Sequence, residues 1–267
     1  MNVEEIRSRN NIHIFGNGKT PLLFAHGFGC DQTMWRFLTP HLLEAFKIVV
    51  FDYVGCGKSD PKAFNLTKYS QLDGYAQDII DICEGLELTD TIIIGHSVSA
   101  MSGLIAATKT PELISKLIMV CPSPYFLNDP PDYYGGFERS DLEELVQLMD
   151  KNYIGWANHL APLVMGLSGE SMVEELADSF CSTDPVFAKA FAKATFFSDC
   201  REKLTIASQP TLILQSSEDE LAAVSVGKYI QSKMQNAELE IITANGHCLH
   251  MTNPVEIAAG IKRFVIA

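Results

Sequence analysis

The sequence predicts an α/β fold in which a mostly parallel central sheet is flanked by helices and interrupted by a helical insertion. Short apolar runs rich in β-branched residues recur along the chain, and most are followed by a helical pattern. Strands that helices bury on both faces have this composition. Strand-like runs are missing only between about residues 124 and 205, where the patterns are helical. The chain of 267 residues is 47% hydrophobic, which is enough for one large core.

The predicted strands share a nearly continuous apolar character. They cover residues 21–27, 47–55, 91–96, 116–122, 210–219 and 239–246. The stretch "NIHIFGNGKTPLLF" adds an expected N-terminal hairpin, because Asn17-Gly18 is a strong turn signal. The alternation of strand and helix predicts parallel pairing with right-handed crossovers.

The predicted helices have recognisable starts. Asp31 is a suitable cap for a helix over "QTMWRFLTPHLLEAF", and residues 71–85 show one apolar face. The last helix is expected to begin near Asn253-Pro254 and to run to Phe264.

The insertion contains the helical patterns "SDLEELVQLMDKNYIGWANHLAPLVM", "ESMVEELADSF" and "DPVFAKAFAKATFF". We expect one domain over 1–267, with its core at 1–123 and 206–267 and the insertion at about 124–205. In an open α/β sheet, such an insertion lies over the carboxyl ends of the strands, where ligands bind.

Composition excludes several classes of function. The formal net charge is −13 and no basic stripe is present, which disfavours nucleic acid and anionic membrane surfaces as partners. The seven cysteines are irregularly spaced, which is typical of free thiols in a reducing cytosol. The polar start of the chain does not resemble a signal peptide, and no apolar run has the length of a membrane span. We therefore expect a cytoplasmic protein.

The stretch "IIIGHSVSA" predicts a buried strand, a sharp turn at Ser97 and a helix. A nucleophile elbow has the pattern Gly-x-Ser-x-Gly, and only the last position, Ser99, departs from it. Serine adds one hydroxymethyl group where the helix approaches the neighbouring strand, which affects packing and not chemistry. For Ser97 alone, a helix cap is the commoner role.

A serine nucleophile needs a histidine base and an acid that orients the histidine. In the α/β-hydrolase arrangement, the acid follows the serine along the chain and the histidine comes last. Asp219 closes the strand at 210–219, and His247 follows the last strand after Gly246. The alternative acid, Asp129, lies well beyond the end of its strand. This order favours a catalytic Ser97, and no metal or other cofactor is required.

The oxyanion hole needs two backbone N–H donors. Val98, the residue after the nucleophile, is expected to supply one. Phe28 in "HGFG" is expected to supply the other, because this loop follows the strand at 21–27.

Other signals have structural interpretations. His96 fills the variable position of the elbow, and His26 is expected to orient its loop. Cys248 and His250 match no zinc spacing, and "VGCGKS" lacks the first glycine of a phosphate-binding loop. Trp156 and the other aromatic residues of the insertion are helix-packing residues by default. Their place above the strand ends makes them pocket candidates.

Seven motifs together resemble the RsbQ-like group of α/β-hydrolases, which also includes the plant strigolactone and karrikin receptors. They are "HGFGCDQTMW", "FDYVGCGKSD", "GHSVSA", "PSPYFLNDPPDYYGGFE", "KNYIGWA", "FCSTDP" and "FFSDCRE". The similarity covers nearly the whole chain, and the serine at position 99 is part of the group's pattern.

The resemblance implies a four-helix cap over an apolar pocket and a working triad of Ser97, His247 and Asp219. By motif match to this group, the residues Phe28, Tyr125, Phe137 and Phe196 of this chain would line the pocket. Leu160, a further expected pocket residue, stands where plant relatives tend to carry phenylalanine, which implies a different pocket shape. The resemblance also implies a PAS-domain serine phosphatase as partner, in signalling that activates a stress sigma factor.

We therefore expect an esterase-type serine hydrolase for a small hydrophobic carbonyl compound. The main alternative is a strigolactone/karrikin-type ligand receptor with slow or single-turnover hydrolysis that signals through a partner protein. A cofactor-free lyase or perhydrolase is a third use of the same scaffold.

Overall fold

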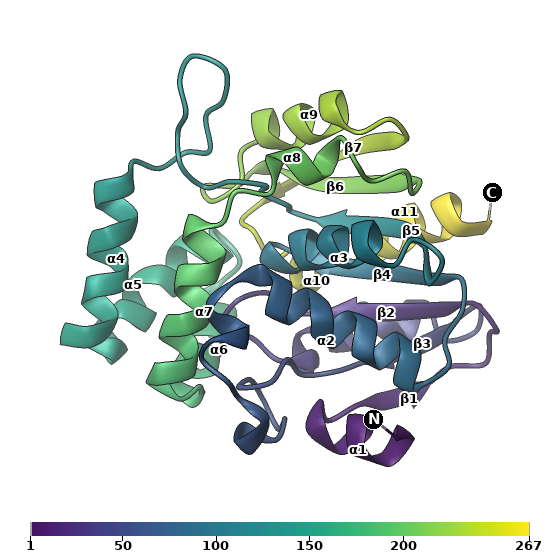
Figure 1. Ribbon diagram of the computed structural model, residues 1–267. Helices are drawn as coiled ribbons and strands as arrows, with labels where there is room; N and C mark the ends of the chain where they lie inside the picture. Colours follow the sequence, from purple (N-terminus) through teal and green to yellow (C-terminus); the bar gives the residue numbers. More distant parts are fainter. Residues whose placement is uncertain (1, 267) are drawn as a thin grey trace.

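The computed structural model describes residues 2–266 and consists of a seven-stranded sheet with helices on both faces (Figure 1). The strands are β1 (His13–Phe15), β2 (Pro21–Ala25), β3 (Lys47–Val50), β4 (Thr91–His96), β5 (Ile114–Val120), β6 (Thr211–Glu218) and β7 (Ala237–Asn245). Their order is β1-β3-β2-β4-β5-β6-β7. Every pairing is parallel except that of β1 with β3. The predicted fold class is thereby confirmed.

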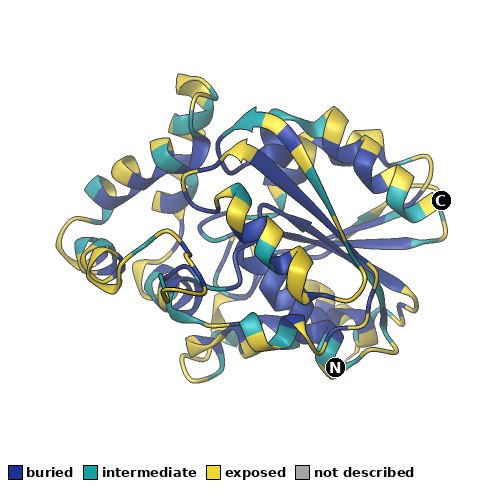
Figure 2. Ribbon diagram, turned by 90° about the horizontal axis from the view of Figure 1, so that it is seen from above, coloured by how far each residue is buried: buried dark blue, intermediate teal, exposed yellow. Residues whose placement is uncertain are grey.

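The two faces of the sheet carry separate cores. The helices outside the insertion are α1 (Val3–Arg9), α2 (Leu72–Gly85), α3 (Val98–Lys109), α8 (Arg201–Leu204), α9 (Val224–Lys233), α10 (Leu249–Thr252) and α11 (Pro254–Ile266). Leu23 and Ile93 point toward α2, α3 and α9, whereas Leu22 and Ile92 point toward α11. Figure 2 shows the central strands buried along most of their length and the flanking helices exposed on their outer sides, whereas the edge strands β1 and β7 are largely accessible. Burial on both faces explains the continuous apolar runs of the sequence.

The insertion forms four helices between β5 and β6. They are α4 (Arg139–Lys151), α5 (Tyr153–Met165), α6 (Glu170–Ser182) and α7 (Pro185–Phe197). Asp184 caps α7 through a hydrogen bond from the Val186 N–H, and Pro185 takes the first helical position, where its missing N–H costs nothing. These four helices form a cap beyond the ends of the central strands (Figure 1).

The expected N-terminal hairpin is wrong. β1 pairs with β3 and not with β2, the strand that follows it in sequence. Asn17 and Gly18 donate backbone hydrogen bonds to Leu43 and Phe46, so the turn packs on the loop before β3. A Cβ at Gly18 would lie 2.0 Å from the carbonyl oxygen of Ala45, which explains the glycine by close packing.

The helix expected after Asp31 is replaced by shorter turns. Asp31 does accept the N–H of Thr33, but the segment forms the 3-10 helices η1 (Gln32–Phe37) and η2 (Thr39–His41). Two further 3-10 turns, η3 (Pro61–Ala63) and η4 (Lys68–Ser70), precede α2. Pro40 lacks an N–H and prevents one continuous helix. By contrast, the helices predicted at 71–85 and from Pro254 are confirmed by α2 and α11.

No helix among residues 2–266 combines the length and the apolar character that a membrane crossing needs.

Candidate active site

Ser97 lies at a strained turn between β4 and α3. Its φ and ψ are 55° and −124°, a conformation that L-residues rarely adopt. The turn is tight because a Cβ at Gly95 would lie 2.5 Å from the Ser99 carbonyl oxygen. The Ser97 N–H donates to the carbonyl of Val120 at the end of β5, over 2.8 Å. This strand–turn–helix geometry fits the nucleophile elbow predicted from the sequence.

Ser97, His247 and Asp219 form a continuous chain of hydrogen bonds. The Oγ of Ser97 lies 2.7 Å from the Nε2 of His247, whose Nδ1 lies 2.7 Å from the Oδ2 of Asp219. All three residues are buried. The three side chains come from loops after β4, β7 and β6, so the parallel sheet brings together residues up to 150 positions apart. The Ser97 hydroxyl bonds to His247 rather than capping α3, in contrast to the commoner role of a serine at this position.

Asp219 is held as a carboxylate. Its Oδ1 accepts the backbone N–H groups of Leu221 and Ala222 at 2.9 and 3.0 Å. Burial by itself would raise the pKa of Asp219, but His247 and these two N–H donors outweigh burial and lower the pKa below its ordinary value. An ionised Asp219 fixes the Nδ1–H tautomer of His247 and leaves Nε2 free to accept the Ser97 proton. The neighbouring Glu218 points elsewhere, since its carboxylate accepts from Asn245.

The loop of His247 is tied to the cap. The His247 N–H donates to the carbonyl of Val164 in α5 over 2.7 Å. Gly246 has a φ of 96°, and a Cβ there would lie 2.4 Å from the carbonyl oxygen of Met165. The end of α5 therefore fixes the backbone on which the candidate base is carried.

The two expected oxyanion donors flank Ser97. Val98 is the first residue of α3, so its N–H belongs to the group that a helix leaves unbonded at its start. Phe28 lies in the loop after β2, next to the end of β4, because Ala25 pairs with Gly95. Gly29 has a φ of 70°, and a Cβ there would lie 2.1 Å from the ring of Phe180. The donor roles of Val98 and Phe28 stay predictions.

A small apolar cavity opens above Ser97 and His247. Its volume is about 30 Å³. Because one water needs about 10–15 Å³ of such volume, the cavity has room for roughly two waters. Phe28, Leu160 and Phe196, three of the predicted pocket residues, line it. A larger ligand therefore requires side chains or cap helices to move.

The other predicted pocket residues lie outside this wall. Trp156 is fully buried and contacts Phe28 edge-to-face, with 5.8 Å between ring centroids. The ring of Phe137 lies 6.3 Å from that of Phe126. Tyr125 lies under the guanidinium of Arg201 at 4.7 Å. Trp156 and Phe137 thus form a second layer that packs on lining residues, and Tyr125 packs against the first residue of α8.

Sequence reasoning missed several lining residues, chiefly Phe126, Leu176 and Phe180. Phe180 stacks on Phe28, with ring centroids 6.0 Å apart. Phe180 occurs in the motif "FCSTDP", but an aromatic residue on an amphipathic helix gives no sign of which neighbour it will meet. Its relation to Gly29 depends on how α6 docks on the loop after β2.

Cys121, Asp219 and His247 also have atoms within 4.8 Å of one another, a spacing that suits a metal ion. Two of these residues already use their ligand atoms in a mutual hydrogen bond. Burial raises the pKa of the Cys121 thiol well above its ordinary value, so it is a thiol and not a thiolate ligand. The arrangement therefore fits a hydrogen-bonded triad better than a metal centre.

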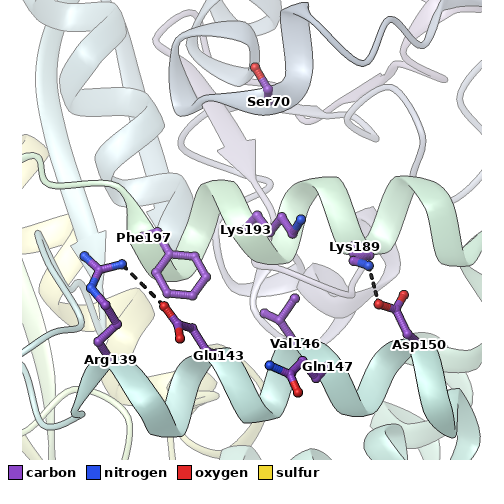
Figure 3. A pocket seen from close by; sticks show the side chains of 9 residues that line it. All are labelled: Ser70, Arg139, Glu143, Val146, Gln147, Asp150, Lys189, Lys193 and Phe197. Atoms are coloured by element: carbon purple, nitrogen blue, oxygen red, sulfur yellow. Dashed lines mark hydrogen bonds and ion pairs between the residues drawn. The ribbon is translucent and has the colours of Figure 1, made fainter.

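A larger groove, of about 520 Å³, lies between α4 and α7 on the outside of the cap (Figure 3). Its walls carry two ion pairs, Arg139 with Glu143 and Lys189 with Asp150. It shares no residue with the cavity at Ser97. Volume alone would favour this groove as the ligand site, whereas the hydrogen-bonded Ser97 and His247 favour the smaller cavity that they line.

Comparison with known proteins identifies the family. Residues 20–254 match the model of the alpha/beta hydrolase fold. The chain belongs to the α/β-hydrolase family. A hydrolase from Oleispira antarctica is 54% identical, with a TM-score of 0.98 over 100% of this chain and 98% of that one.

Curated relatives narrow the group. The chain is 38% identical to "Karrikin insensitive 2 receptor CA" of Petunia hybrida, over 97% of each protein. It is 34% identical to "Strigolactone esterase RMS3" of Pisum sativum, over 93% of each. The resemblance to an α/β-hydrolase group that includes strigolactone and karrikin receptors is thereby confirmed.

Proposed function

We propose that this α/β-hydrolase is an esterase-type serine hydrolase acting on a small, mostly hydrophobic carbonyl compound. The observation that supports it most directly is the Ser97–His247–Asp219 hydrogen-bonded chain at the base of an apolar cavity. A serine hydroxyl is a weak nucleophile, and a positioned imidazole with an orienting carboxylate is the arrangement that activates it.

In this mechanism the Oγ of Ser97 attacks the carbonyl carbon while Nε2 of His247 takes the hydroxyl proton. The N–H groups of Phe28 and Val98 stabilise the negative oxygen of the tetrahedral intermediate. His247 returns the proton to the leaving alcohol as the ester bond breaks, which leaves an acyl-serine. Water then attacks the acyl group with His247 again as base, releasing the acid and restoring Ser97.

A fluorogenic short-chain ester tests this proposal. Ser97→Ala is expected to lower kcat by more than about 10³-fold, since the nucleophile is lost. Ser102→Ala is the matched control, because Ser102 is a buried serine of the helix that follows Ser97 and does not line the cavity. Equal turnover by wild type and Ser97→Ala would refute the proposal.

The alternative function, a ligand receptor with slow or single-turnover hydrolysis, is favoured by the names of the relatives. A thermal shift with a strigolactone, measured in wild type and in Ser97→Ala, separates the two. A shift that survives loss of Ser97 supports binding as the output. A shift lost with Ser97, together with multiple turnovers by the wild type, supports catalysis.

The biological setting we propose is cytoplasmic signalling with a PAS-domain serine phosphatase, as in the RsbQ-like group. All seven cysteines are unpaired in the structure, which agrees with a reducing compartment. We also propose that residues 1–267 act as one domain, in which the cap around α4–α7 depends on the core for its position. Copurification with such a phosphatase, compared between full-length protein and a variant lacking the cap, would test the partner.

A further inference from the structure

His96 occupies the variable position of the elbow, between Gly95 and Ser97. Its side chain is buried, and its Nε2 lies 3.0 Å from the backbone carbonyl oxygen of His247. A carbonyl oxygen can only accept a hydrogen bond, so the proton of the neutral ring must lie on Nε2. The residue before the candidate nucleophile therefore holds the backbone of the candidate base.

The opposite edge of the His96 ring contacts the loop after β2, which carries Phe28. A Cβ at Gly27 would lie 2.4 Å from the Nδ1 of His96, so only glycine lets the loop after β2 pack on the ring. One imidazole thus contacts the loops that carry Phe28, Ser97 and His247. Burial lowers the pKa of His96 to about 3, and the ring stays a neutral donor across the physiological range.

We propose that His96 is a positioning residue that sets the distance between Ser97 and His247 through its hydrogen bond to the His247 backbone. This inference rests on the proposed hydrolase function and goes beyond it. His96 does not exchange a proton with substrate. It acts through His247, whose Nε2 must stay within hydrogen-bonding distance of the Ser97 hydroxyl.

The neighbouring His250 provides a matched control. It is fully buried, and its ring centroid lies 4.4 Å from that of His96. Among residues 2–266, neither of its ring nitrogens has a hydrogen-bond partner. It does not line the cavity at Ser97. Replacing His250 perturbs the same region of the core without removing either partner of the hydrogen bond from His96 to His247.

The test compares His96→Gln with His96→Met. The two new side chains have nearly the same length, and only glutamine can donate to the His247 carbonyl. Because a misplacement of about 1 Å can cost about 10²-fold, we expect His96→Met to lower kcat by about 10–100-fold with little change in KM. We expect His96→Gln to recover most of this loss, and His250→Phe to keep wild-type kcat.

The rate at which a fluorophosphonate labels Ser97 is the second readout, since it reports the nucleophile directly. Slow labelling of His96→Met with near-normal labelling of His96→Gln supports the inference. Equal labelling of both at the wild-type rate would overturn it and leave the hydrolase proposal intact. Equal slowing of both would also overturn it, because the donor would then not matter. Absence of labelling in the wild type would instead refute the hydrolase proposal itself.

Discussion

Asp219 and His247 share a buried hydrogen bond of 2.7 Å, and the second carboxylate oxygen of Asp219 is occupied by two backbone N–H groups. One oxygen thus bonds to the imidazole, and the backbone N–H groups hold the other oxygen in place. This pairing makes the contribution of Asp219 measurable by substitution.

Asp219→Asn is expected to lower kcat by about 10³–10⁴-fold, because the amide favours the wrong tautomer of His247. The fold should persist, since asparagine has the same shape. Glu220→Gln, at the exposed next position, serves as the control and should stay within a few-fold of wild type. Steady-state ester hydrolysis measures both, and a nearly active Asp219→Asn would contradict the assignment.

Ser99→Gly restores the glycine of the usual elbow. The Ser99 hydroxyl donates to the carbonyl oxygen of His26 at the end of β2, so the substitution loses that bond. It also introduces glycine into α3, and together these changes should cost about 2 kcal/mol of unfolding free energy. Urea denaturation measures the loss. We expect kcat to change little, because Ser99 bonds away from Ser97, and a large loss of kcat at unchanged stability would contradict this role.

Leu160→Ala enlarges the cavity beside Ser97. We expect kcat/KM to rise for longer acyl chains relative to acetate, measured with a p-nitrophenyl ester series. The substitution should also destabilise the fold by about 2–5 kcal/mol, as for other buried leucines. Leu142→Ala, equally buried in α4 but outside the cavity, should cause a similar loss of stability. An identical change of chain-length preference in both variants would mean that Leu160 does not shape the pocket.

Acid should destabilise the protein through its buried histidines. Burial lowers the pKa of His26 and of His250, and lowers that of His96 to about 3, whereas the unfolded groups titrate near 6.5. Below pH 6.5 the unfolded chain binds protons that the folded chain does not. The unfolding free energy should therefore fall with decreasing pH, by up to about 1.4 kcal/mol per pH unit for each such histidine.

Chemical denaturation between pH 7.5 and 5 measures this slope. His250→Phe removes one of the three groups. It should reduce the slope by up to about 1.4 kcal/mol per pH unit, which corresponds to one proton. An unchanged slope in that variant would show that His250 is not held neutral in the folded state.

Much of the site follows from the sequence because local patterns place each residue at the end of a strand. Gly95 and Ser97 identify the turn after β4, and Asp219 and His247 follow β6 and β7. Parallel pairing then brings the carboxyl ends of these strands to one edge of the sheet. No distance had to be known to expect these side chains together, and the structure places them within hydrogen-bonding distance.

The remaining features depend on contacts that local patterns do not encode. Asn17-Gly18 has the composition of a hairpin turn, but the loop at 43–46 accepts the hydrogen bonds of these two residues, and β1 pairs with β3. Likewise, the stacking of Phe180 on Phe28 is set by the docking of α6. Turn residues and helix periodicity predict single helices and turns. Strand pairing and the residues that line the pocket depend on contacts between segments that are distant in sequence.

The small volume of the cavity above Ser97 has a kinetic consequence. If the resting form admits little more than water, capture of a ligand needs an opening step before contact. The observed rate of ligand binding should then level off as ligand concentration rises. The plateau would equal the rate at which the cap opens and would be the same for ligands of different affinity.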